Sequence, residues 1–458
     1  MGPDAVRISP NERLRMLLVE AEWTAGELAR AVNSLGTSQA MTLRYDRTAV
    51  AHWLSGSKPR SAVAELVAAA FTRRIGRLVT VEETGLAHVS PQDDIRFVDR
   101  FSEGPLLKRL VVLARADADP AQRAYLVQSA YRLAAVPPGW GQSGVLIQPP
   151  LEDRRQAGAE DVQALNAMVN VFADQTERHG GGHARAALAA FVANDVSRTL
   201  TAAAAPDLRR ELVTSTAQLT HLLALMTADA GHQGLAQIYY QITLELARVA
   251  ENRAAYAIAL RAMSVQAMHV GHPRTALELA DAALEIPDLY ADEATMAFLL
   301  SQQAVVRARD GQRREALTKL SAAEKHLERS TSTPGPFTAY PRAALEYQRA
   351  HCLLALGQRA AALAALRDSL RLRIPERRRT STLTEARMAE VLLAHGHLDE
   401  ACAHWDRFLD QCSLLRSTQV NQAVTRLQGL LRPYLRQRQA RLVWDRARSI
   451  ADGLQGRY

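Results

Sequence analysis

The chain has 458 residues, of which 56 are Lys or Arg and 48 are Asp or Glu, giving a formal net charge of +8. This length exceeds what one hydrophobic core normally organises, so several domains are expected. Alanine and leucine are abundant, aromatic residues make up only 5%, and alternating β-branched runs are scarce. These features predict an all-α protein and exclude a sheet-based fold.

Compartment and cofactor signals are few. No stretch of about eighteen apolar residues is present to cross a bilayer, and Met1 to Pro10 lacks the pattern of a signal sequence. Cys352, Cys402 and Cys412 are odd in number and form no C-x-x-C pair, so neither a disulfide framework nor a zinc site is indicated. We expect a cytoplasmic protein that contacts no membrane, has reduced, buried cysteines, and uses no metal and no cofactor.

The N-terminal region predicts two short helices. The run Ser9-Pro10-Asn11-Glu12 has the residues of a helix start, ahead of an apolar set formed by Leu14, Leu17 and Leu18. Thr24 and Glu27 form a second capping box, and Gly36 is expected to end the helix that follows.

A third helix is predicted from Asp46, its cap, to Gly56. Val50 and Trp53 are three residues apart and should share its buried face. The opposite face carries Arg47, Thr48, Ala51 and His52. A fourth helix is expected to begin with Ser61 as cap, run through Ile75 and stop at Gly76.

This series resembles the Cro-type helix-turn-helix of phage repressors and their bacterial relatives. The matching residues are E-L-A at 27–29 and A-V-A-H-W-L-S-G at 49–56. The resemblance implies that the helix from Arg47 reads DNA, with four of its residues facing bases or phosphates: Arg47, Thr48, Ala51 and His52. The connection from Gly36 to Tyr45 is several residues longer than the usual turn, which leaves the placement of the two helices open.

The residue types suit double-stranded DNA. Arg and His can donate to purine edges, and basic residues beside the helix can position the phosphate backbone. The DNA-binding set is therefore Arg44, Arg47, Thr48, Ala51, His52, Lys58 and Arg60. The alternative is a small helical domain, residues 1–88, with a solvated basic face. A homodimer is expected, because two half-sites would then be spaced by symmetry.

Residues 89–158 are predicted to connect this domain to the rest. Helical patterns run from Pro105 to Arg115 and from Ala121 to Ala135, and the proline-rich stretch from Pro137 to Arg155 is typical of an interdomain linker. A hinge in that stretch and a passive surface loop are equally compatible with its composition.

Residues 159–458 contain a repeated pattern. Five glycines are each followed five residues later by alanine and preceded at seven residues by a small residue. The glycines are Gly231, Gly271, Gly311, Gly357 and Gly396, the alanines are Ala236, Ala276, Ala316, Ala362 and Ala401, and the small residues are Ala224, Ser264, Ala304, Ala350 and Ala389. Glycine is favoured where a helix ends in a left-handed turn, and small residues are needed where two helices cross closely.

These positions resemble those of tetratricopeptide repeats, although the spacings of 40, 40, 46 and 39 residues exceed the usual period of about 34. The interruption Pro334-Gly335-Pro336 accounts for the longest gap. Chance matches in an alanine-rich helical protein are the alternative. A weaker sixth element has Gly182, Ala187 and Phe191, with Gln175 in place of the small residue, and is expected to cap the array.

The string His179-Gly180-Gly181-Gly182-His183-Ala184-Arg185 lacks the G-K-[ST] ending of a phosphate-binding loop. A turn between helices explains its glycines. It resembles a G-G-G-H-A-R signature of large helix-turn-helix regulators with tetratricopeptide-like C-terminal regions, common in filamentous actinomycetes. Phe172 and Asp174 loosely match the aromatic and acidic residues that precede the signature there. The resemblance implies transcriptional regulation of development or specialised metabolism.

Tetratricopeptide arrays bind partners in a groove lined by the first helix of each hairpin. Counting back from the repeat glycines transfers those positions to His221, Asp229, Arg261, His269, Arg309, Tyr347, His351 and Glu390. They are candidates to contact a peptide, a small molecule or a protein effector. For each residue alone, ordinary solvation or an interhelix contact is the simpler alternative.

No arrangement of Ser, His and Asp, of paired carboxylates or of nucleotide-binding residues stands out, so we do not expect an enzyme. The sequence predicts a dimeric DNA-binding transcriptional regulator with a sensory superhelix. The alternative is a tetratricopeptide interaction scaffold whose helix-turn-helix is structural.

Overall fold

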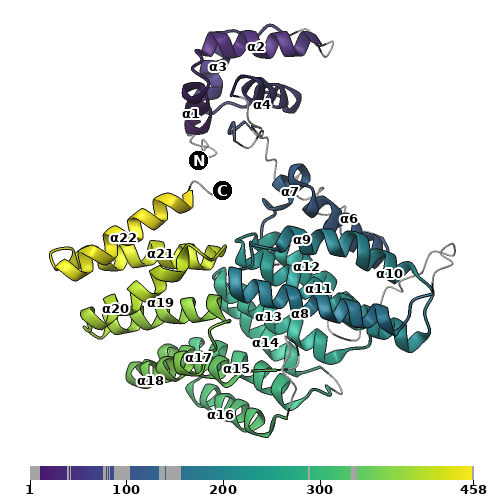
Figure 1. Cartoon of the computed structure of the whole chain (residues 1–458), viewed down its shortest axis with the longest axis vertical. Coiled ribbons are helices and arrows are strands. Elements are labelled where there is room, and N and C mark those ends of the chain that lie inside the picture. The colour runs from purple at the N-terminus through teal and green to yellow at the C-terminus, as the bar shows by residue number, and fades with distance from the viewer. Residues whose placement is uncertain are drawn as a thin grey trace, which may run out of the picture. The chain divides into compact units, whose positions relative to one another are not determined.

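The computed structural model describes residues 11–38, 41, 43–75, 79, 81, 83–86, 104–133, 140, 156–286, 289–331, 337 and 339–455. Internal contacts divide the chain into two compact units, Met1–Arg100 and Phe101–Tyr458, and each is described by itself (Figure 1). Several predicted features lie outside the described residues: Ser9, Pro10, Gly76, the linker over 141–155 and at 137–139, and the interruption at 334–336.

The first unit contains four described helices around one apolar core. Leu14, Leu28, Val50, Trp53 and Phe71 contribute to this core. The helices are α1 (Glu12–Glu20), α2 (Ala25–Ser38), α3 (Arg47–Leu54) and α4 (Ser61–Ile75).

The helix starts follow the predicted caps in part. The Thr24 and Glu27 capping box is confirmed, since the Thr24 N–H donates to the Glu27 carboxylate at 2.7 Å and the Glu27 N–H donates to Thr24 Oγ1 at 3.3 Å. For α1 the cap is Asn11, whose side chain accepts from the Leu14 N–H. Helix α4 begins one residue earlier than a Ser61 cap would allow, because the Arg60 carbonyl accepts from the Ala64 N–H.

Gly36 does not end α2, which continues to Ser38. A glycine is needed at position 36 for another reason: a Cβ added there would lie 2.5 Å from a methyl carbon of Leu43. The glycine therefore permits the close return of the chain after α2 and does not terminate the helix.

The second unit is also all-α. Its one described β-bridge is isolated and joins Gln156 to Ala203. Its first helices are α6 (Leu106–Ala118), α7 (Pro120–Leu126), α8 (Ala159–His179), α9 (Arg185–Phe191), the π-helix η2 (Val192–Val196) and α10 (Ser197–Thr201). Helix α7 ends nine residues before the predicted Ala135.

Helical hairpins make up the rest of this unit, and successive hairpins pack against each other (Figure 1). They are α11 (Pro206–Asp229) with α12 (Gln233–Val249), α13 (Arg253–His269) with α14 (Pro273–Leu284), α15 (Glu293–Arg309) with α16 (Arg313–Arg329), α17 (Arg342–Ala355) with α18 (Arg359–Arg371), α19 (Arg378–Ala394) with α20 (Leu398–Cys412), and α21 (Thr418–Leu431), followed by the 3₁₀ turn η3 (Arg432–Tyr434), with α22 (Arg438–Gln455).

The five repeat glycines lie in the turns inside the first five of these hairpins. Their φ angles run from +76° to +95°, a conformation that glycine adopts without strain. The residue after each glycine donates its N–H to the carbonyl five residues back, as His272 does to Ala267 at 2.8 Å, which is the bond of a Schellman motif. The predicted role of these glycines is confirmed.

The five small residues and the five alanines that flank the glycines are all 0% exposed. Ser264 shows why: its hydroxyl donates to the Ala276 carbonyl at 2.7 Å, so the two helices of the hairpin are in direct contact there. The second unit is therefore a tetratricopeptide-like α-solenoid.

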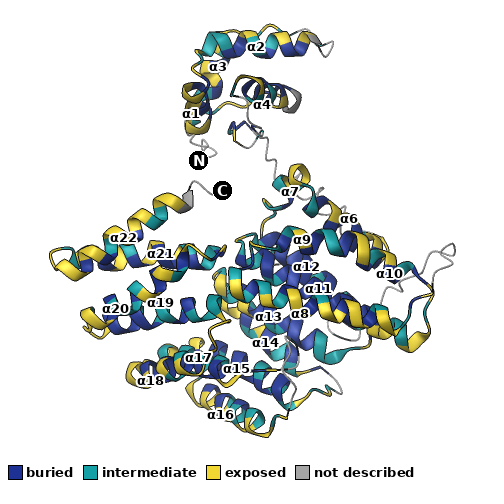
Figure 2. Cartoon of the chain, in the orientation of Figure 1, coloured by how far each residue is buried: buried dark blue, intermediate teal, exposed yellow. Residues whose placement is uncertain are grey.

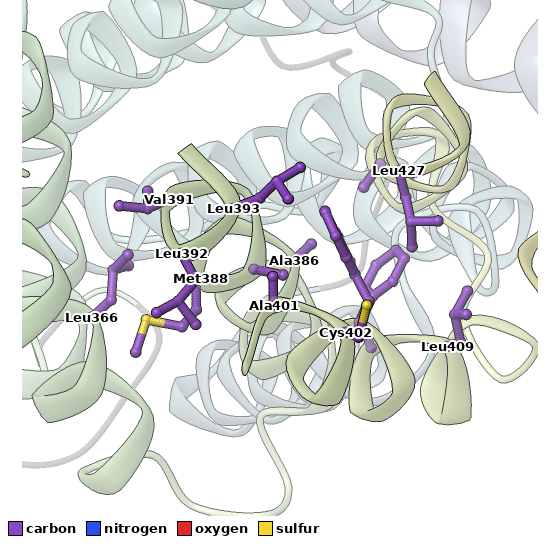
Figure 3. Packing of buried hydrophobic residues seen from close by; sticks show 14 of the residues in the cluster. Leu366, Ala386, Met388, Val391, Leu392, Leu393, Ala401, Cys402, Leu409 and Leu427 are labelled. Carbon is purple, nitrogen blue, oxygen red and sulfur yellow. The ribbon is translucent and has the colours of Figure 1, made fainter. Parts of the chain in front are cut away.

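Each of these helices has a buried face and a more exposed face (Figure 2). One apolar cluster joins the hairpins from α17 to α22 and includes Leu366, Met388 and Leu427 (Figure 3). Cys402 and Cys412 belong to the same cluster and Cys352 to the preceding one. All three cysteines are buried and free, and burial raises the pKa of Cys352 to about 11.

Helix α6 packs on the solenoid through a buried polar network. The Asp117 carboxylate is 0% exposed and accepts from Arg185 at 2.7 and 2.8 Å and from the Tyr239 hydroxyl at 2.9 Å. Because a buried carboxylate is costly without partners, these contacts fix α6 to α9 and α12.

The glycine-rich string joins distant hairpins. In the sixth element the glycine with positive φ is Gly180, with φ +83° and ψ 159°, and not the predicted Gly182. The Gly182 N–H donates to the Arg416 carbonyl at 2.9 Å, and the Arg416 N–H donates to the His179 carbonyl at 2.7 Å. A Cβ on Gly180 would lie 2.6 Å from the Arg416 oxygen, so only glycine permits this contact between the end of α8 and the segment before α21.

Candidate functional sites

The first candidate surface is the outer face of α3 in the N-terminal unit. Val50 and Trp53 are 0% and 4% exposed and anchor the helix, as predicted. The proposed DNA-contacting residues all lie on the surface: Arg44, Arg47, Thr48, Ala51, His52, Lys58 and Arg60 are exposed. The N–H groups of Thr48 and Ala49 donate to Asp46 at 3.0 and 2.9 Å, and these bonds lower the pKa of the Asp46 carboxyl.

The long connection before α3 is attached to α2 by one side chain. The Asn33 amide donates to the Tyr45 carbonyl at 2.8 Å, and its oxygen accepts from the Tyr45 N–H at 2.9 Å. The Tyr45 ring also meets Trp53 edge-on, with centroids 5.2 Å apart. These contacts hold the start of α3 against α2 within the described part of this unit, and they settle the helix placement that the connection length left open.

The second candidate site is a cavity of about 230 Å³ inside the solenoid. Helices α11, α12, α13, α15, α19 and α21 supply most of its walls. Four of the eight predicted groove residues line it: His221, Asp229, Arg261 and His269. The repeat register thus identified one wall of the cavity.

Arg261 is the notable charge in this cavity. Its Nε–H donates to the Phe298 carbonyl at 3.0 Å, and its guanidinium carbon lies 3.5 Å from the centroid of the Phe298 ring. Burial lowers the pKa of Arg261 to about 10, so the group remains a cation at neutral pH. No carboxylate within the described ranges pairs with it.

Aromatic rings surround this cation. Tyr340 meets Phe298 edge-on at 5.3 Å between centroids. The His221 ring makes edge contacts with Tyr240 and Phe337, with ring centroids 5.5 and 5.3 Å apart. Burial, assisted by the charge of Arg261, lowers the pKa of His221 to about 4, so His221 is neutral at pH 7.

Asp229 lines the cavity, but its carboxylate is already occupied. It accepts from Arg379 at 2.7 and 3.0 Å, from the Ser417 hydroxyl at 2.8 Å and from the Gly181 N–H at 2.8 Å. We call these four residues the Asp229 junction. It joins the C-terminus of α11 to the glycine-rich turn, to α19 and to the residue that caps α21, so that helices far apart in the chain enclose one side of the cavity.

The other four predicted groove residues gather elsewhere on the solenoid and do not line this cavity. Tyr347 and His351 are in ring contact at 4.6 Å, and Glu390 pairs with Arg387 at 2.7 Å and with Arg426 at 3.1 Å. Burial, followed by the charges of Arg387 and Arg309, lowers the pKa of His351 to about 3. Arg309, Tyr347, His351 and Glu390 therefore gather near Arg387, outside the lining of this cavity.

Several cavity residues were missed by the sequence reasoning: Tyr240, Phe298, Phe337, Tyr340, Arg379 and Gln419. Tyr240 is on the second helix of its hairpin, and Phe337 lies between hairpins, so neither falls on a groove position of the repeat. Arg379 and Gln419 reach the cavity because the Asp229 junction brings late helices beside early ones. No periodic signal encodes that contact.

Within the described residues, no helix has the length and apolarity to cross a membrane, and no cluster of side chains is suited to hold a metal ion. The profile of a family described as the SP15 N-terminal domain matches residues 14–87. No curated protein matches the chain. Among solved structures, the chain is similar to the APC/C hetero-tetramer Cut9-Hcn1, with 15% identity, a TM-score of 0.33, and coverage of 95% of this chain and 69% of that one.

Proposed function

We propose that the protein is a non-enzymatic, tetratricopeptide-like interaction scaffold whose solenoid binds an effector on its inner surface. One observation carries this proposal: His221, Arg261 and His269, which were selected by the same spacing from the repeat glycines, all line one cavity. Concave cavities with apolar walls and a few convergent polar groups are the usual form of a ligand site.

A fragment screen on the full chain tests this proposal. We would record ligand-observed NMR with neutral, cationic and anionic fragments, and repeat it with Val265→Trp. Val265 lines the cavity and is 39% exposed, so the larger ring should obstruct the cavity without overpacking the core. Val112→Trp is the matched control, because Val112 is 43% exposed on α6 and does not line the cavity.

We expect a set of fragments that bind to the unaltered chain and to Val112→Trp but do not bind to Val265→Trp. Fragments that bind with equal strength to both variants, or no bound fragments at all, would contradict the proposal.

A second candidate function is sequence-specific binding of double-stranded DNA by the N-terminal unit, in a homodimer that regulates transcription. The exposed set on α3, together with Lys58 and Arg60, favours it, since a helix anchored by its apolar face can present donors to a major groove. In that case the solenoid would sense the effector for the DNA-binding unit.

Selection of DNA sites from a random pool by the full chain tests the second candidate. We expect Arg47→Ala and His52→Ala to lower affinity for the selected site, and Arg15→Ala, an exposed residue on α1, to leave it unchanged. The logarithm of affinity should fall with the logarithm of salt concentration, by a slope of about 0.9 for each phosphate contact. If no DNA site is selected, DNA binding is contradicted and the scaffold role is the function that remains.

A further inference from the structure

We infer that the cavity binds a small organic anion with a planar apolar body, and that the acid group of this ligand pairs with Arg261. The inference rests on the proposed function of the inner surface and names the chemical class of its effector.

The charges of the cavity wall do not balance. Among the described lining residues, the charged ones are Asp229, Arg261 and Arg379. Asp229 and Arg379 neutralise each other in the Asp229 junction. The two lining histidines, His221 and His269, both have a lowered pKa, because burial disfavours their charged forms. One positive charge, that of Arg261, is left without a counter-charge.

The terminal donors of Arg261 have no acceptor among the described residues. Only its Nε–H donates within the described structure, and the acceptor is the Phe298 carbonyl. The ring of Phe298 lies against the guanidinium and restricts its plane. The terminal nitrogens, which donate to no described acceptor, can form the paired bonds that a guanidinium makes with a carboxylate or similar acid.

The remaining walls favour a planar apolar body. Phe298, Tyr340, Tyr240 and Phe337 contribute rings, and rings pack against planar groups by offset stacking or edge contacts. A cationic ligand would face the uncompensated charge of Arg261. A neutral one would cover its donors without satisfying them, at a cost typical of a buried group that lacks its hydrogen bond.

The test compares 1-naphthoate with 1-naphthamide, which have the same ring system and differ in charge. Binding to the full chain would be measured by isothermal titration calorimetry. We expect naphthoate to bind at least ten times more tightly than naphthamide. We also expect Val265→Trp to abolish both interactions, which places them in the cavity.

Arg261→Gln should remove the preference for naphthoate. Arg448→Gln is the matched control, since Arg448 lies over Trp444 at 6.0 Å, is exposed and does not line the cavity. If Arg261→Gln fails to fold, the preference of the unaltered chain and its loss on Val265→Trp still decide the question.

Equal affinity for the two compounds, no binding of naphthoate, or a preference that survives Arg261→Gln would overturn the inference. The proposed function would fail separately. If naphthoate shows no preference over naphthamide while neutral fragments bind the unaltered chain and not Val265→Trp, the inner surface is a binding site but not one selective for anions.

Discussion

The two units differ in the residues that they bury. In the N-terminal unit the described helices bury apolar side chains almost exclusively, and Arg47, His52 and Lys58 are exposed. In the solenoid, charged groups such as Asp117 and Asp229 are buried at 0% and 1% exposure and are fully partnered. The comparison teaches that the described part of the first unit offers its polar side chains on its outer surface, whereas the second unit also holds partnered charges in its interior.

The largest effect should come from breaking the buried charges of the solenoid. Asp229→Ala leaves Arg379 without its carboxylate partner, and removing one member of a buried pair costs about 3–5 kcal/mol. Asp174→Ala is the control: its partner Arg178 is exposed, and such pairs contribute about 0–1 kcal/mol. Equilibrium urea unfolding measures both. Similar losses in the two variants would show that the interior charges of the solenoid are not specially important.

A smaller effect is expected at the glycine-rich turn. Gly180→Ala combines a positive φ with a clash against the Arg416 carbonyl, and we expect a loss of about 2–3 kcal/mol. Gly271 also has a positive φ, +89°, but nothing lies within 4 Å of an added Cβ, so Gly271→Ala should cost only about 1 kcal/mol. Thermal unfolding compares the variants, and equal losses would remove the argument for a close contact with Arg416.

Acid should weaken the solenoid through its buried histidines. The pKa of His221 is about 4 in the folded chain against 6.5 in the unfolded chain, so the unfolded state takes up a proton first as pH falls. The contribution of neutral His221 to the free energy of unfolding is fully present above pH 6.5. It decreases by about 1.4 kcal/mol per pH unit as the pH falls from 6.5 toward 4.

His221→Gln should therefore reduce the pH dependence of the free energy of unfolding between pH 6.5 and 4. His232 and His351 also have pKa values lowered by burial, so part of the dependence will remain. An unchanged pH profile would contradict the buried, neutral state of His221.

The smallest effect is expected at the outer face of α3. Arg47→Ala and His52→Ala remove exposed side chains and should change the free energy of unfolding by no more than about 0.5 kcal/mol. Urea unfolding of the full chain checks this value. A large loss of stability at either position would show that this face is structural, and the contrast between the two units would disappear.

Local features of the fold could be read from the sequence because each depends on a few neighbouring residues. The repeat glycines require a left-handed turn, and the small residues at −7 and +5 require a close helix crossing, so both signals survive in the sequence. The Thr24 capping box and the pairing of Val50 with Trp53 are local in the same way. The prediction that Gly36 ends a helix was wrong, because a glycine needed for a close contact with Leu43 looks the same in the sequence as one that ends a helix.

The cavity was less predictable because its closure is not local. Half of the predicted groove residues line the cavity, because the spacing of the repeat determines which residues form one of its walls. The opposite wall depends on Asp229 meeting Arg379 and Ser417, residues 150 and 188 positions away. No spacing rule relates these residues, and their side chains have no distinctive type.

The contact of the glycine-rich turn with Arg416 has a consequence for how the solenoid unfolds. Open repeat arrays hold each repeat only by its neighbours, so they can fray from either end. Here the stretch that begins the array is bonded to helices near its finish, and fraying at one end must break contacts at the other. We expect cooperative melting of all six hairpins together, in place of the stepwise loss of terminal repeats.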